Sequence, residues 1–310
     1  PKDVNIIILN KRGVIDLKFF FKLIKLISMN KWDAIDSKIS GVNEYVLFIS
    51  GFLRKKGIIV EIRSSGPRKN QLYKRANFLI RIFNLKGVKI ICNSQKAHLE
   101  LLNYGAKNSI VIRNGIDTEK YKQIIFNGPS TNYKKGYVGR IVRDKNLEVI
   151  LLAIDLLREK LDNISLDIWG SVQDEYYFSR LKSLIVEKKL SKNVTFHQSV
   201  SNVENVYNDL DLFILPSLYE GTPNVLLEAM SCETVCLISE NANSDKFLPE
   251  QFVFETTDAV HLAEKIYNLY NLNESILVSI KKKNREFVEK NYSLKAMVRS
   301  YTNLYLNECQ

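Results

Sequence analysis

The sequence predicts an α/β protein built from two doubly wound domains, each with a mainly parallel sheet. Short apolar runs rich in β-branched residues alternate with longer helical patterns along the 310 residues. A polar stretch, NGPSTN at 127–132, interrupts this rhythm. The charge balance changes at the same place, because residues 1–132 hold 24 Lys/Arg against 9 Asp/Glu and the remainder 21 against 25. We therefore place the domains at 1–131 and 132–310.

The first domain begins with an apolar run and an amphipathic segment. In KFFFKLIKLISMNKW, Lys18, Lys22 and Lys25 recur at helical spacing, which fits either a helix that covers a sheet or a helix at a membrane surface. No earlier strand and glycine-rich turn precede this segment, so we expect the domain to lack its first strand and loop. The expected strands are VNIIIL (4–9), VLFI (46–49), IIVEI (58–62), KIIC (89–92) and IVIR (110–113).

The second domain repeats the alternation more regularly. Because ligands of doubly wound sheets bind beyond the carboxyl ends of the strands, the loops that follow these runs should hold the site. The expected strands are YVGRIV (137–142), SLDIWG (165–170), VTFHQ (194–198), LFILP (212–216) and VCLIS (235–239).

Bulk composition narrows the function classes. A hydrophobic content of 45% with 25% charged residues argues against a disordered or membrane-embedded chain. No apolar run approaches the ~20 residues of a spanning helix, and the first residues lack the pattern of a secretion signal, so we expect a cytoplasmic protein. The four cysteines and three histidines show no metal-ligand spacing, and we expect neither a metal nor a cofactor.

The net charge of +11 indicates anionic partners for the basic first domain. Nucleic acid, a phosphorylated substrate and an anionic membrane all fit this charge. No aromatic-basic RNA motif or helix-turn-helix pattern supports the nucleic-acid reading. A comparison of vesicle and DNA binding across salt concentrations separates a membrane-binding protein from a nucleic-acid-binding one.

The stretch LYEGTPNVLLEAM predicts an anion pocket at a helix start. Thr222 is a favourable N-cap and Pro223 a favourable first helical residue. The unpaired N–H groups of Asn224 and Val225 would face an anion, and Gly221 would let it approach the backbone.

Two carboxylates and two cations complete the predicted site. Glu220 precedes the helix and Glu228 lies about one and a half turns inside it, so they address different parts of one ligand. In YVGRIVRDKN, Arg140 and Lys145 follow a strand at a spacing that lets both reach one diphosphate. Without metal ligands in view, this cation pair would have to stabilise a departing nucleotide diphosphate.

These motifs resemble a known family. YVGRIVRDKN, the WGS at 169–171, VTFHQSV and above all DLFILPSLYEGTPNVLLEAM are similar to the nucleotide-sugar-binding half of the retaining glycosyltransferases of family 4. VIRNGID at 111–117 and the closing FVEKNYSLKAMVRSYTNLY extend the resemblance over most of the chain. The resemblance implies two Rossmann-like domains facing across a cleft, the GT-B fold.

The resemblance also implies roles for single residues. Arg140 and Lys145 would grip the donor diphosphate, Glu220 would contact the transferred sugar and Glu228 the ribose hydroxyls. Each also has a structural alternative. Glu220 would be a surface charge, Glu228 a polar residue on a helix face, and Arg140 and Lys145 solvated cations at a strand end. The implied nucleotide-sugar site comprises Glu228, Gly139, Gly221, Thr222, Pro223, Asn224, Val225, Gly170, Ser171, His197 and Val200.

On the acceptor side the sequence matches the family only in part. In IIVEIRSSGP, Arg63 and Ser64 occupy the place where many members carry a histidine, which resembles a branch acting in bacterial surface-polysaccharide and lipid-linked oligosaccharide assembly. Arg63 would engage a pyrophosphate or pair with Glu61. Asn114 would line the cleft or form a plain turn. Glu233 replaces a glycine usual in the family, and ENANSDKFLPE lacks the Gly-Gly that often follows and would shape the sugar pocket, so the resemblance leaves the donor sugar open.

The resemblance implies a retaining, metal-independent hexosyltransferase with a nucleotide-sugar donor and a lipid-linked or polysaccharide acceptor. We expect the donor to be UDP-linked. A non-catalytic nucleotide-sugar-binding subunit of an assembly complex is one alternative. A nucleotide-sugar epimerase with the same two-domain fold is another, and product analysis would reveal it.

Overall fold

The computed structural model describes residues 5–308 except 14, 30, 55–56, 63–73, 76–77, 82–87, 104, 125–132 and 162–163. The chain forms two compact units, one of Pro1–Ile112 with Arg299–Gln310 and one of Arg113–Val298. This division differs from the boundary at 131/132 expected from the sequence. The segment after Arg113 belongs to the second unit because the Ile116 N–H donates to the Tyr292 carbonyl at 2.7 Å. The expected linker at 127–132 lies outside the described residues.

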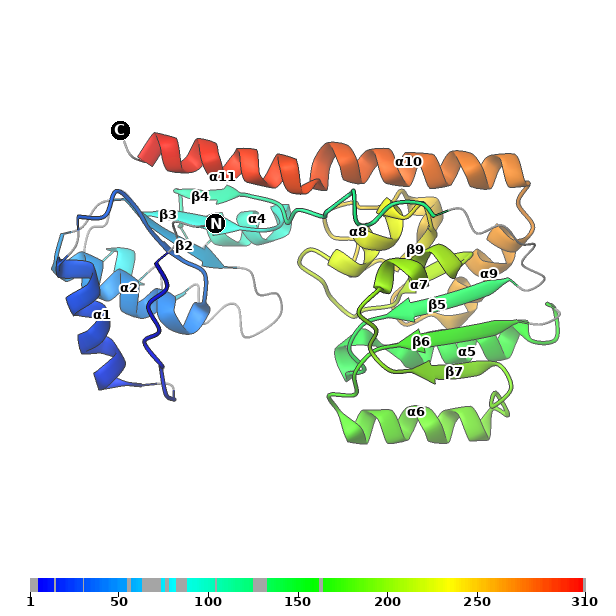
Figure 1. Cartoon of the computed structure of the whole chain (residues 1–310). Coiled ribbons are helices and arrows are strands. Elements are labelled where there is room, and N and C mark those ends of the chain that lie inside the picture. Colours follow the sequence, from blue (N-terminus) through cyan, green and yellow to red (C-terminus); the bar gives the residue numbers. More distant parts are fainter. Residues whose placement is uncertain are drawn as a thin grey trace. The chain divides into compact units, whose positions relative to one another are not determined.

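In its described residues the first unit has a four-stranded parallel sheet in the order β1-β2-β3-β4. Figure 1 labels β2, β3 and β4 of this sheet. All five residues of β2 are buried, including the charged Glu61. The core lies between this sheet and the helices, with Phe19, Leu23 and Ile27 of α1 on its buried face. The strands are β1 (Ile35–Ser37), β2 (Ile58–Ile62), β3 (Lys89–Cys92) and β4 (Ser109–Val111), and the helices are α1 (Leu17–Met29), α2 (Ser40–Phe52), α4 (Gln95–Asn103) and part of α11 (Leu294–Glu308).

The second unit has a six-stranded parallel sheet in the order β10-β9-β8-β5-β6-β7. Helix α5 packs against α9, whereas α8 packs against α7 and α10. The strands are β5 (Lys134–Val138), β6 (Ser165–Trp169), β7 (Val194–His197), β8 (Leu212–Leu215), β9 (Val235–Ser239) and β10 (Val253–Phe254), and the helices are η1 (Arg143–Lys145), α5 (Leu147–Leu157), α6 (Glu175–Glu187), α7 (Val203–Asp209), α8 (Asn224–Ser231), η2 (Glu250–Phe252), α9 (Ala259–Tyr270) and α10 (Glu274–Tyr292).

The strand order of the second sheet reverses beside β5. From β5 the chain proceeds outward through β6 to β7, then returns to place β8 on the other side of β5. The register aligns Lys135 with Leu212 across this return. Loops that leave two such strands diverge at their carboxyl ends, which is where doubly wound sheets bind ligands.

Two expected strands of the first unit are wrong. VLFI at 46–49 lies inside α2, where Val46, Leu47 and Ile49 face the core. A short apolar run fits a buried strand or a buried helix equally well. Residues 5–9 form no strand, and Ile6 and Ile8 are exposed. In the described part of the chain no helix is long and apolar enough to cross a bilayer.

Candidate active site

The central contact of the site joins the loops that follow β5 and β8. Lys145 Nζ donates to Glu220 Oε1 at 2.5 Å, and their side chains are only 16% and 14% exposed. The two loops are also tied through Asp144, whose carbonyl accepts from the Leu218 N–H at 2.9 Å. Tyr219 hydrogen-bonds the Asp144 side chain, and this contact raises the pKa of Tyr219 to about 12. The sequence-predicted cation and carboxylate therefore meet at the strand-order reversal.

The turn after β5 is shaped by two glycines. Gly139 and Gly170 have φ angles of +153° and +154°, which favour glycine. A Cβ on Gly170 would lie 1.8 Å from the Gly139 carbonyl oxygen, so the two loops touch through their backbones. The Tyr137 hydroxyl donates to the Arg140 carbonyl at 3.0 Å and fixes the chain as it leaves the strand.

Buried hydroxyl groups orient the Glu220 carboxylate. Ser217 Oγ donates to Glu220 Oε1 at 2.7 Å, so one carboxylate oxygen accepts from both Ser217 and Lys145. The Ser217 carbonyl in turn accepts from Ser239 Oγ at 2.6 Å. Ser217 was missed in the sequence, although its place three residues before Glu220, directly after a strand, is a usable signal.

Arg140 lies in the same loop as Lys145 but is more exposed to solvent. Its side chain is exposed, and Nη1 contacts Gln173 Oε1 at 3.3 Å. It belongs to the turn that leads to Lys145, so both cations of the predicted pair stand beyond β5. Because the guanidinium is exposed, an anion that enters from solvent can bind it through two N–H groups at once.

Helix α8 begins one residue later than expected. Asn224 is its first residue and Pro223 takes the N-cap position, so the prediction of Thr222 as N-cap is wrong. Pro223 still starts the turn, because its carbonyl accepts from the Leu226 N–H at 3.0 Å. Asn224 and Val225, as the first two helical residues, have N–H groups beyond the reach of intrahelical acceptors. Gly221 and Thr222 are partly buried just before this turn.

Glu228 lies deeper, against two tyrosines that the sequence did not single out. The Tyr207 hydroxyl donates to Glu228 Oε2 at 2.9 Å. Burial raises the pKa of Glu228, while the hydrogen bond from Tyr207, the charge of Lys120 and the side chain of Tyr121 act to lower it. A carboxylate kept in such surroundings is typical of functional sites.

A stacked ring pair joins the last residues of β6 and β7. His197 lies against Trp169 with ring centroids 4.5 Å apart and an angle of 11° between the planes. His197 Nε2 lies 2.7 Å from Asp167 Oδ1, and its carbonyl accepts from the Gly170 N–H at 3.2 Å. The ring of His197 is thus held by neighbours on β6. Ser171 and Val200 are exposed in the adjoining loops.

The predicted acceptor-side residues are only partly described. Arg63 and Ser64 lie outside the described residues. Asn114 belongs to the second unit, where its Nδ2 donates to Asn224 Oδ1 at 2.9 Å. Asn114 therefore lies beside the start of α8, with the residues predicted to bind the donor.

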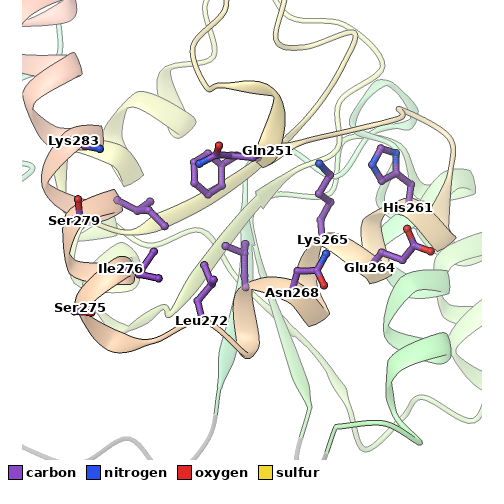
Figure 2. Close-up of a pocket in the computed structure, with 13 residues that line it drawn as sticks. Gln251, His261, Glu264, Lys265, Asn268, Leu272, Ser275, Ile276, Ser279 and Lys283 are labelled. Atoms are coloured by element: carbon purple, nitrogen blue, oxygen red, sulfur yellow. The ribbon is translucent and has the colours of Figure 1, made fainter.

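A separate cavity of about 710 Å³ lies between α9 and α10, beside η2 (Figure 2). Its walls carry Gln251, Lys265, Asn268 and Ser279 among others, and none of the predicted site residues lines it. Within the described residues no group of three or more His, Cys, Asp or Glu is placed to hold a metal ion.

Comparison with known proteins places these features in a family. The model for glycosyl transferases group 1 matches residues 119–293. The capsular polysaccharide biosynthesis glycosyltransferase CapM of Staphylococcus aureus is 29% identical over 240 residues, 73% of this chain and 61% of CapM. The UDP-Gal:alpha-D-GlcNAc-diphosphoundecaprenol alpha-1,3-galactosyltransferase of Escherichia coli is 23% identical over 94% of this chain and 80% of its own length.

Solved structures show the same fold. Anabaena Alr3699/HepE, crystallised in complex with UDP, superposes with a TM-score of 0.81 at 16% identity, over 92% of this chain and 81% of HepE. This likeness confirms the expected fold of two Rossmann-like domains. The family match spans more than half of the sequence and covers η1, α8 and both glutamates. The chain belongs to the family of glycosyl transferases group 1.

Proposed function

We propose that the protein is a glycosyltransferase of surface-polysaccharide biosynthesis that moves a hexose-type sugar from a UDP-linked donor. The observation that carries the proposal is the contact of Lys145 with Glu220 at the strand-order reversal. The site thus supplies a cation for a leaving phosphate and a carboxylate for a developing positive charge within one loop pair. Family membership and the biosynthetic names of its relatives support the same activity.

The proposed reaction retains the anomeric configuration and needs no metal ion. The bond between the anomeric carbon and the diphosphate oxygen breaks, and a bond to the acceptor hydroxyl oxygen forms on the same face. The departing phosphate oxygen takes the acceptor proton. Lys145 and Arg140 stabilise the negative charge of the leaving diphosphate, and Glu220 supports the oxocarbenium-like centre.

The proposed acceptor is a lipid-linked or polysaccharide hydroxyl, and the proposed working place is the cytoplasmic face of an anionic membrane. On α1, Lys18, Lys22 and Lys25 are exposed beside the exposed Leu17 and Phe21. Lysines interleaved with large apolar side chains are typical of interfacial helices. Flotation with vesicles of neutral and anionic lipid tests this part, and equal binding to both would contradict it.

The donor is tested by thermal shift with UDP-, GDP- and dTDP-sugars, because a ligand that binds only the folded state raises the melting temperature. We expect UDP-sugars to give the largest shift.

The Glu220→Gln variant should keep this shift but lose most turnover, whereas Glu228→Ala should lose the shift. Equal loss of binding in both variants would contradict the assigned roles, and a product with an epimerised donor sugar would favour an epimerase.

A further inference from the structure

Tyr207 of the second unit is held by its surroundings so that its hydroxyl is directed at Glu228. The residue is fully buried, and its ring packs edge-on against Phe213 with centroids 5.7 Å apart. Its carbonyl accepts from Thr234 Oγ1 at 2.8 Å. With backbone and ring fixed, the hydroxyl donates to Glu228 Oε2 at 2.9 Å. The orientation of the Glu228 carboxylate is therefore set from α7.

Tyr121 supplies a second hydroxyl from a different part of the chain. Its ring lies 6.3 Å from that of Tyr207, and its side chain acts with Tyr207 to lower the pKa of Glu228. The Tyr121 carbonyl accepts from Ser231 Oγ at 2.5 Å and from Arg285 Nη1 at 3.3 Å. The backbone that carries this hydroxyl is thus anchored to α8 and α10.

The surroundings keep both hydroxyls as donors. Burial, and then the negative charge of Glu228, raise the pKa of Tyr207 and raise that of Tyr121 to about 12, so both remain protonated at neutral pH. Lys120 is the cation that acts on Glu228, and it also pairs with Glu204 at 3.6 Å. Among the described residues, Asp117, Cys232 and Arg285 are further titratable or charged groups around this cluster.

A carboxylate offers about four acceptor positions, and a protonated tyrosine can donate to only one of them. Two tyrosines therefore leave acceptor capacity on Glu228 for a ligand with hydroxyl groups. We propose that Tyr207 and Tyr121 are positioning residues that hold the Glu228 carboxylate as an acceptor for the ribose hydroxyls of the nucleotide donor. This inference rests on the proposed function, which assigns a nucleotide donor to the site.

The test compares UDP with 2′-deoxy-UDP in calorimetric titrations of the full chain. Wild type should bind UDP more tightly than 2′-deoxy-UDP, because the deoxy ligand leaves a carboxylate acceptor unpaired. Tyr207→Phe should weaken UDP by about tenfold and reduce the discrimination, since a hydrogen bond to a charged group is lost. In turnover assays the KM for the donor should rise while kcat at saturation stays near that of wild type.

The pH dependence separates positioning from general damage. Removal of the Tyr207 hydroxyl removes a contact that lowers the pKa of Glu228. The acid limb of UDP binding should therefore move to higher pH in Tyr207→Phe, and Tyr121→Phe should move it in the same direction. Tyr133→Phe is the matched control, because it deletes a buried tyrosine hydroxyl of the same unit that has no hydrogen-bond partner among the residues that the structure describes. The control should leave affinity, discrimination and pH limb unchanged.

The outcomes distinguish the inference from the function on which it rests. If Glu228→Gln binds UDP as wild type does, the nucleotide role of this carboxylate fails, and the positioning role fails with it. If Glu228→Gln weakens UDP but Tyr207→Phe and Tyr121→Phe keep wild-type discrimination and pH limb, the positioning role alone is overturned. Should Tyr207→Phe fail to fold, judged by thermal unfolding, Tyr121→Phe carries the test.

Discussion

Lys145 Nζ and Glu220 Oε1 lie 2.5 Å apart, and the contact joins the loops that follow β5 and β8, the two strands at which the sheet order reverses. A diphosphate that binds the Lys145 ammonium must share it with the Glu220 carboxylate. A ligand that carries both an anion and a positively polarised carbon would satisfy both partners at once. The pair therefore favours a donor with its leaving group attached over free phosphate.

Lys145→Ala should weaken UDP binding by at least tenfold, because the proposed charge-assisted contact to the diphosphate would be lost. The variant should also be less stable by about 1–3 kcal/mol, since the largely buried Glu220 loses its cation and keeps Ser217. Arg143→Ala, an exposed cation of the same short helix, is the control and should change both quantities little. Titration and chemical unfolding measure them, and equal effects of the two variants would contradict the assignment.

The second unit could be predicted from the sequence far better than the first. Runs such as SLDIW and VCLIS alternate with helices of clear length, so type and order followed from periodicity. VLFI failed because α2 buries the polar Asn43 and Ser50 while Phe48 and Phe52 are exposed, so apolar side chains do not mark its buried face. Strand β1 was missed because three residues, IDS, carry no period.

The sequence singles out those candidate site residues that share one short motif or directly follow a strand. Glu220 and Glu228 share a stretch of nine residues, and Lys145 follows a recognisable strand. Tyr121 and Tyr207 were missed because they reach Glu228 from segments 107 and 21 residues away. Nothing in their local pattern distinguishes such tyrosines from ordinary core aromatics. Only the folded backbone brings these hydroxyls to one carboxylate.

Glu228→Gln should stabilise the protein at neutral pH while it weakens donor binding. Burial raises the pKa of Glu228 above the ordinary value of 4.5. The folded state therefore binds the proton more tightly than the unfolded chain, and wild-type stability falls as pH rises through this interval. The variant lacks this loss, so its melting temperature should exceed that of wild type at pH 8, by roughly 2–4 °C per kcal/mol, and approach it at acid pH. A constant difference across pH would contradict this origin.

Gly170→Ala should destabilise the second unit by more than about 2 kcal/mol. The new Cβ would lie 1.8 Å from the Gly139 carbonyl, at a φ of +154° that a side chain disfavours. Both loops of the site would have to shift. Gly41→Ala is the control, because its Cβ would meet nothing within 4 Å at the start of α2, and it should be neutral or stabilise by up to about 1 kcal/mol. Thermal unfolding compares the two, and similar losses would contradict the steric account.

Lys38→Met should destabilise the first unit, because Lys38 Nζ donates at 2.8 Å to the fully buried Glu61 carboxylate, which also accepts from the Tyr301 hydroxyl. Removal of the cation should cost about 1–3 kcal/mol, less than for a fully buried pair, since the Lys38 side chain is 52% exposed. Although burial opposes it, the hydrogen bond to Glu61 and the charge of Asp36 raise the pKa of Lys38 above its ordinary 10.5. The stabilisation should therefore be complete below pH 10.5 and decline above it.

Lys134→Met breaks a more exposed pair with Asp209 and should cost less than about 1 kcal/mol. Chemical unfolding from pH 7 to 11 measures both, and a Lys38→Met effect no larger than that of Lys134→Met would show that Glu61 does not depend on this cation.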